Sequence, residues 1–216
     1  MTRYVRPPVE IATFRDAQGN PIPYGRRFLE DEGPPEDTYG TCLHPERFEP
    51  VVTVAAALVE FLVATYEVDH DVVVDGDRTT ATFVPSEGTA MTITTSTADG
   101  PGVEVGAGVR YRGLWPDCGC DACDDDVADL LDDLEATVLT IAEGGFSEWR
   151  SGPEPSMPLV TDDLGRALGD EVVPWLSHVR FQGRLESQSS GWSTEAPEPV
   201  ELPTEPRRDP AWPLRR

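Results

Sequence analysis

The segment that most constrains the fold is HPERFEPVVTVAAALVEFLVATYEV, residues 44–68, which is apolar around most of a helix. Its polar residues at 46, 49, 53, 60 and 67 form one narrow stripe at helical spacing. The rest of the helix surface must therefore be buried. Proline is tolerated in a first turn, so the helix is expected to begin at Pro45 or at Pro50. The apolar run 51–66 contains Glu60 and is shorter than the ~20 residues that span a bilayer.

Short β-rich segments separated by turn residues follow this helix. DVVV, TTATFV and TAMTITTS each end at a turn that contains glycine or proline. The segment GVEVGAGVRYR, residues 102–112, alternates as a single strand would. One face of that strand would carry Val103, Val105, Ala107, Val109 and Tyr111. Short strands joined by tight turns predict an antiparallel meander that is covered on one face.

A second amphipathic helix is predicted after the cysteine-rich segment. Its apolar stripe consists of Val127, Leu130, Leu131, Leu134, Val138 and Ile141. Three aspartates at 124–126 stand where the helix dipole favours negative charge, and Gly144 and Gly145 end the pattern. Leu131 is therefore expected in the core, with Asp132 on the opposite face.

These elements predict an α+β fold: one domain with an antiparallel β meander and two main amphipathic helices on one face. Residues 1–44 are expected to form an extended N-terminal arm anchored on the core by aromatic residues, namely Tyr4, Phe14, Tyr24 and Phe28. Residues 45–193 would form the core domain, with a short helix at 161–168 and a strand at 176–187. Residues 194–216 are Pro-rich and are predicted to be a disordered tail that can be removed without loss of stability.

The net charge of −23 is concentrated in the middle of the chain. Residues 45–146 carry four arginines against 21 acidic residues. Nucleic acid and anionic membrane both require a basic surface, so the composition argues against them and favours a basic protein partner or a metal. The N-terminus has no apolar signal segment, so we expect a cytoplasmic protein whose thiols stay reduced.

Three of the four cysteines lie within residues 118–123, in the pattern C-x-C-x-x-C. Thiolates are strong ligands for zinc, and a structural zinc site requires four ligands. The fourth is expected from TCLHPERF, at the entry to the first helix: His44 is favoured, and Cys42 is the alternative. The predicted structural zinc site is therefore His44, Cys118, Cys120 and Cys123.

Other interpretations of the cysteines remain open. The thiols would serve as small buried residues without a metal, or Cys120 and Cys123 would form a redox pair at a helix N-terminus. The carboxylates of DACDDD argue against the redox pair, because they raise a thiol pKa. An enzyme, either a zinc-dependent hydrolase or a thiol-based enzyme, would need a base such as His70 or His178. The sequence contains no G-x-S-x-G, phosphate loop or H-E-x-x-H, so a non-catalytic binding protein is the favoured function.

The segments PPEDTY, HPERF, GVEVGAGVRYRGLWPDCGCDACDDD and SSGWS together resemble an uncharacterised family of bacterial proteins, a domain of unknown function. The resemblance covers most of residues 1–195, and CGCDAC is its most specific part. It points to His44, Cys118, Cys120 and Cys123, and it does not include Cys42. It implies no activity.

Overall fold

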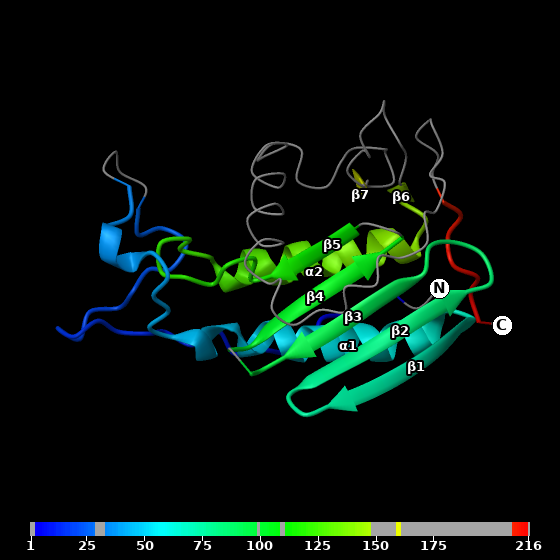
Figure 1. Ribbon diagram of the computed structural model, residues 1–216, viewed down its shortest axis with the longest axis horizontal. Coiled ribbons are helices and arrows are strands. Elements are labelled where there is room, and N and C mark those ends of the chain that lie inside the picture. The colour runs from blue at the N-terminus through cyan, green and yellow to red at the C-terminus, as the bar shows by residue number, and fades with distance from the viewer. Residues whose placement is uncertain are drawn as a thin grey trace, which may run out of the picture.

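The computed structural model describes residues 3–28, 33–98, 100–108, 111–147, 159–160 and 209–215 of the chain. It confirms the α+β class. Five strands form an antiparallel sheet in the order β1-β2-β3-β4-β5, so each strand pairs with its neighbours in sequence (Figure 1). The strands are β1 (Val68–Asp75), β2 (Arg78–Pro85), β3 (Met91–Ser96), β4 (Gly102–Ala107) and β5 (Tyr111–Trp115).

One strand prediction is wrong, because residues 102–112 do not form a single strand. They divide between β4 and β5, which pair antiparallel with Ala107 opposite Tyr111. Gly108 has a φ of 56°, a left-handed conformation that glycine adopts without a steric penalty, and it begins the reversal between the two strands. Val103, Val105 and Ala107 are buried as predicted, whereas Val109 lies outside the described residues.

The first helix is a 3-10 turn, η2 (Pro45–Phe48), that leads into α1 (Glu49–Thr65). Both predicted starting points thus have a structural counterpart. Pro45–Thr65 is the one helical stretch in the described chain that is long and apolar enough to cross a membrane. The core helix of a soluble protein meets the same two criteria. The α1 side chains buried in the core are Val51, Val54, Ala55, Leu58 and Leu62.

The second helix, α2 (Val127–Ala142), lies beside α1 on the same face of the sheet (Figure 1). Asp126 caps it by accepting a hydrogen bond from the Ala128 amide at 2.8 Å. Gly144, with a φ of 79°, follows its C-terminal end. Leu131 is fully buried, and the Asp132 side chain is 73% exposed, as the helix pattern predicts.

The N-terminal arm is extended and anchored by aromatic residues, as expected. Its one helical turn is η1 (Glu36–Thr38) among residues 3–28 and 33–44. The Tyr4 ring packs edge-on against Phe61 of α1, with the centroids 5.3 Å apart. Arg6 forms ion pairs with Asp132 and Glu135 of α2. The arm therefore holds both helices on their solvent side.

The prediction of a disordered tail is wrong for residues 209–215, while residues 194–208 lie outside the described part. Trp212 is 2% exposed and packs against Tyr66 and Phe83, each with a centroid distance of 5.7 Å. Its indole N–H donates to the Thr89 carbonyl at 2.8 Å. One tryptophan buries enough apolar area to dock a short segment. The proline-rich composition of the tail as a whole therefore did not reveal this anchor.

Gly144 also makes room for this C-terminal segment, since a Cβ there would lie 2.5 Å from the Ala211 amide nitrogen. A short strand pair that the sequence pattern did not predict, β6 (Phe146–Ser147) with β7 (Leu159–Val160), follows α2. The helix expected at 161–168 and the strand expected at 176–187 lie outside the described residues.

Candidate metal centre

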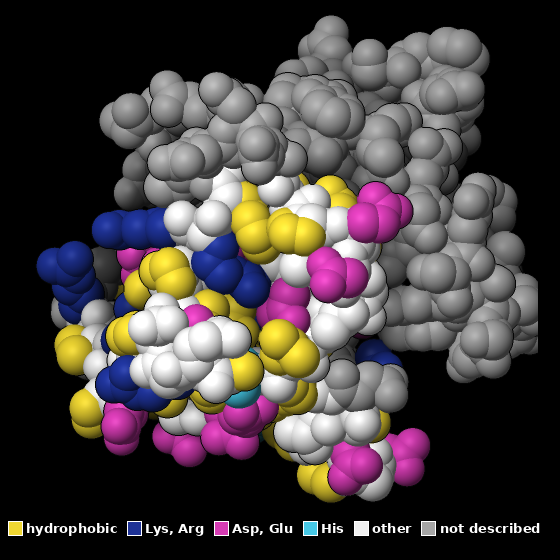
Figure 2. All heavy atoms as spheres, turned by 90° about the vertical axis from the view of Figure 1, so that its left-hand side faces the viewer, with side chains coloured by type: hydrophobic (Ala, Val, Ile, Leu, Met, Phe, Trp, Pro, Cys, Tyr) yellow, Lys and Arg dark blue, Asp and Glu magenta, His cyan; other side chains and the backbone are white. Residues whose placement is uncertain are grey.

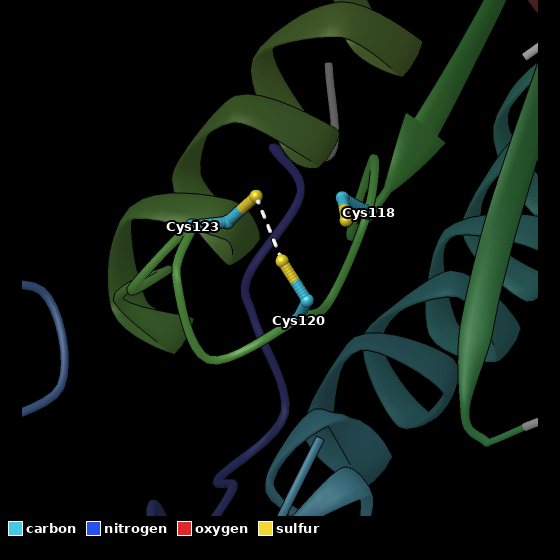
Figure 3. Close-up of side chains that lie close together, drawn as sticks. All are labelled: Cys118, Cys120 and Cys123. Atoms are coloured by element: carbon cyan, nitrogen blue, oxygen red, sulfur yellow. Dashed lines mark hydrogen bonds between the residues drawn. The ribbon is translucent and has the colours of Figure 1, made fainter. Parts of the chain in front are cut away.

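The three clustered cysteines lie in the loop between β5 and α2. Cys118 is exposed, Cys120 is buried and Cys123 is half-buried. Their three sulfur atoms lie within 4.8 Å of one another, and the Cys120 thiol donates to the Cys123 sulfur at 3.5 Å. Figure 3 shows that Cys120 and Cys123 point toward each other across the turn of the loop. The sequence prediction that these three thiols converge agrees with this geometry.

The backbone of the loop brings the thiols together. The Cys123 amide donates to the Cys120 carbonyl at 3.1 Å, which closes a tight turn between the two residues. Gly119 has a φ of 75°, a conformation that side chains with a Cβ rarely adopt. A Cβ there would also press on Pro116 at 3.1 Å. The glycine of C-G-C is therefore a requirement of the loop that presents the first two thiols.

The spacing of the sulfurs fits a tetrahedral ion. Zinc binds thiolate at about 2.3 Å, so two sulfurs on one ion lie roughly 3.5–4 Å apart. The 3.5 Å separation of Cys120 and Cys123 is in this range, and Cys118 is near enough to join them by a small side-chain adjustment. Three soft donors of this kind suit zinc and other thiophilic ions.

The three thiols differ in acidity. Burial raises the pKa of Cys120, but its hydrogen bonding with Cys118, with the Gly40 backbone and with Cys123 outweighs this and brings the pKa down to about 7. Partial desolvation raises the pKa of Cys118, although its side chain is exposed at the surface. Burial, together with the hydrogen bond to Cys120, raises the pKa of Cys123 well above its usual range. The buried central thiol is thus the first to become a thiolate, the form that binds metal and acts as a nucleophile.

The segment before α1 is hydrogen-bonded to the cysteine loop. The Asp121 amide donates to the Thr41 carbonyl at 2.7 Å, and the Ala122 amide donates to the Thr38 carbonyl at 3.2 Å. The Asp121 carboxylate accepts from the Leu43 amide at 3.0 Å. The two helix entries are therefore neighbours in the fold, as the proposed ligand set required.

A charged cluster that the sequence pattern did not reveal lies beneath this junction. Asp121 is 1% exposed and faces two guanidinium groups, with Arg47 Nη1 at 3.3 Å and Arg27 Nη2 at 3.7 Å. Arg27 also binds Asp124, through its side chain and through its amide at 2.7 Å. The Tyr24 ring lies between the two arginines, 3.8 Å from the Arg47 guanidinium carbon and 4.4 Å from that of Arg27.

This cluster changes the electrostatics expected for the cysteines. The sequence predicts that the acidic residues of DACDDD act as charges on the thiols, but two of them, Asp121 and Asp124, are paired with arginines from the arm and from η2. Figure 2, which views this end of the molecule, shows arginine and acidic side chains interspersed over it. Arg27 and Arg47 each precede a phenylalanine, in GRRF and in HPERF, and this was the one sequence feature that pointed to the cluster. The sequence around them does not indicate that they pair with residues 121–124.

His44 is placed near this junction but apart from the sulfur group. Among the described residues, that group consists of Cys118, Cys120 and Cys123. The His44 ring stacks on Phe14 with a centroid distance of 4.6 Å, and its Nδ1 lies 3.2 Å from Glu46 Oε1. Cys42 is exposed and is likewise outside the group.

Of the two histidines considered as catalytic bases, His70 is among the described residues. His70 lies in β1, at the opposite edge of the sheet from β5, which leads into the cysteine loop. His178 lies outside the described residues. The candidate hydrolase or thiol enzyme therefore has no histidine base beside the cysteines among the residues that the structure describes.

Comparison with known proteins agrees with the resemblance seen in the sequence. The model of a family of unknown function, DUF6226, matches residues 10–216, and the chain belongs to this family. No curated protein and no solved structure matches the chain significantly.

Proposed function

For this member of DUF6226, we propose that Cys118, Cys120 and Cys123 bind one zinc ion that stabilises the junction of the cysteine loop with the N-terminal arm. The observation that carries the proposal is the convergence of three sulfurs within 4.8 Å. They lie in a loop whose backbone amides are hydrogen-bonded to the carbonyls of Thr38 and Thr41. An ion at this point would fix the loop, and through it the start of α2, against the segment that precedes α1. Its role is structural, and the protein is a non-catalytic binding protein of the cytosol, where thiols stay reduced.

The fourth coordination position is the part of the proposal that needs a separate test. His44, the predicted ligand, would have to leave Phe14 and Glu46 and turn toward the sulfurs. A water molecule would otherwise complete the tetrahedron. His44→Ala separates the two cases: loss of zinc affinity supports the imidazole, and unchanged affinity supports water.

A catalytic role for the same site is the second candidate. Catalytic zinc keeps three protein ligands and one open position, and the exposed Cys118 leaves this centre open to solvent on one side. The lowered pKa of Cys120 favours a thiol-based enzyme in the absence of metal. Each of these enzymes needs a base that moves protons, and the group of converging side chains among the described residues contains three cysteines and no histidine.

Native mass spectrometry with metal analysis of the freshly purified, reduced protein tests the proposal. The wild type is expected to carry one zinc per chain and Cys120→Ser none, whereas the matched control Cys42→Ser keeps the zinc. A chelator should lower the unfolding temperature of the wild type and of Cys42→Ser but leave Cys120→Ser unchanged. Wild-type protein that takes up no zinc under reducing conditions would refute the metal centre. Zinc-dependent turnover of an ester or amide substrate would favour the enzyme.

A further inference from the structure

Among the described residues, the edge of the sheet farthest from the cysteines has no further strand paired to it. β1 is the terminal strand, and within the described chain it pairs along its length with β2 only. All of its eight residues except Val68 are exposed. Figure 1 shows β1 as the outermost strand, beyond the region of the sheet that the helices cover. Strand hydrogen bonds alternate in direction, so every second residue of β1 directs its backbone N–H and C=O away from β2.

The second half of this edge strand carries exposed apolar side chains, whereas its first half is acidic. Val72, Val73 and Val74 are 49%, 55% and 70% exposed, and Val84, on the neighbouring strand, is 52% exposed. Among the described residues, α1 has its main sheet contacts with β3 and β4, and the turn end of the β1–β2 hairpin extends beyond both helices (Figure 1). Exposed valines on an unpaired strand are a template for pairing with another strand.

The acidic side chains of β1 determine what kind of strand would pair with its free edge. Asp69 and Asp71 are exposed on one face of β1, and Asp75 ends the strand. Two copies of this edge would bring like charges into the same narrow strip, which disfavours pairing of the chain with itself. A strand that carries arginine or lysine would instead place opposite charges across the new strand pair.

We propose that the free edge of β1 binds an extended, basic segment of a partner protein, which adds a sixth strand to the sheet. Its basic side chains lie against Asp69 and Asp71 on one face, and its apolar side chains lie against Val72 and Val74 on the other. Backbone hydrogen bonds supply affinity, and the alternation of the two faces supplies specificity, as in other cases of strand addition. The proposal shares no residue with the metal centre, so each can fail without the other.

The test uses an eight-residue peptide of alternating arginine and valine, capped at both ends, with the full-length protein. Fluorescence anisotropy should detect saturable binding, and NMR should locate the shifted amides in β1. The double variant Asp69→Lys/Asp71→Lys should bind this peptide at least about tenfold more weakly and should gain binding to the alternating glutamate–valine peptide. The matched control is Glu36→Lys/Asp37→Lys, which changes the same charge at exposed residues of η1 and should leave the affinity within about twofold.

Three results would overturn the proposal. One is equal binding of a peptide with its arginines and valines in separate blocks, since that would mean attraction by net charge alone. Another is equal loss of affinity in the control double variant. The third is self-association of the protein through β1, seen as a concentration-dependent mass by analytical ultracentrifugation that Val72→Lys abolishes.

Discussion

Two acidic regions at opposite ends of the sheet show how differently the same residue type can be used. At the cysteine loop, Asp121 and Asp124 are covered by Arg27 and Arg47, and Asp121 is 1% exposed. At the β1 edge, Asp69 and Asp71 are exposed beside exposed valines. The first pair joins segments almost a hundred residues apart, whereas the second leaves a charged edge open for binding. The difference lies in the arginines, because burial of a carboxylate requires a partner.

The comparison predicts the largest loss of stability for Asp121→Ala. The variant would leave the Arg47 guanidinium buried without its carboxylate, and breaking a buried pair from one side costs about 3–5 kcal/mol. Asp71→Ala, at the exposed edge, is the matched control and should change the free energy of unfolding by less than about 0.5 kcal/mol. Urea unfolding of both variants measures the difference, and equal effects would mean that the Asp121 cluster does not hold the arm.

Trp212→Ala should cost nearly as much, about 3–5 kcal/mol, because the ring is buried between Tyr66 and Phe83. The measurement is the thermal midpoint of the variant and of a chain that ends at residue 208. Both should unfold at clearly lower temperature than the wild type. An unchanged midpoint would restore the original prediction that the C-terminal tail is dispensable.

Leu131→Ala is expected to cost about 2–5 kcal/mol, since it leaves a cavity in the hydrophobic core to which α2 contributes. Asp132→Ala is the neighbouring control on the exposed face, and it removes only an ion pair with Arg6. Chemical denaturation should separate the two variants by well over 1 kcal/mol. Equal losses would show that the phase of α2 is wrong.

Asp133 adds a third kind of carboxylate to the comparison, one that is exposed in part and is hydrogen-bonded to a tryptophan instead of an arginine. Partial desolvation raises its pKa, and the hydrogen bond from Trp115 Nε1 at 2.8 Å offsets this only in part. The folded state therefore keeps this proton to higher pH than the unfolded chain does. The stability that the protonated group supplies is complete below the unfolded pKa and is lost as pH rises through the folded pKa.

Asp133→Asn should accordingly raise the thermal midpoint modestly at pH 7 while retaining an acceptor for Trp115. The gain should shrink as the pH falls toward the ordinary pKa range of an aspartate. The midpoint measured from pH 3 to pH 8 checks this dependence. A variant that is less stable than the wild type at pH 7 would contradict it.

Local patterns in the sequence predicted most of the fold. The apolar stripe of α2, the aspartates at its N-terminal end and the turn residues between strands are all encoded within a few residues. The sequence pattern predicted the structure wrongly where contacts between residues far apart in the chain determine it. Trp212 is anchored by residues more than a hundred positions away, and Gly108 divides an alternating segment that looks like one strand.

The candidate site likewise has one part that local spacing predicted and one part that it did not. Cys118, Cys120 and Cys123 converge because the loop between them is short, so spacing alone identified them. The pairing of Arg27 and Arg47 with Asp121 depends on how the arm crosses the loop, which no local spacing encodes. The placement of His44 against Phe14 follows from the same crossing.

The account rests on three thiolates sharing one ion, and X-ray absorption at the zinc edge of the reduced, zinc-loaded protein tests this most directly. The expected first shell contains three sulfurs at about 2.3 Å and one nitrogen or oxygen at about 2.0–2.1 Å. His44→Ala should leave the number of sulfur ligands unchanged, and it reveals whether the nitrogen or oxygen ligand is the His44 imidazole. A first shell of oxygen and nitrogen without sulfur would contradict the metal centre.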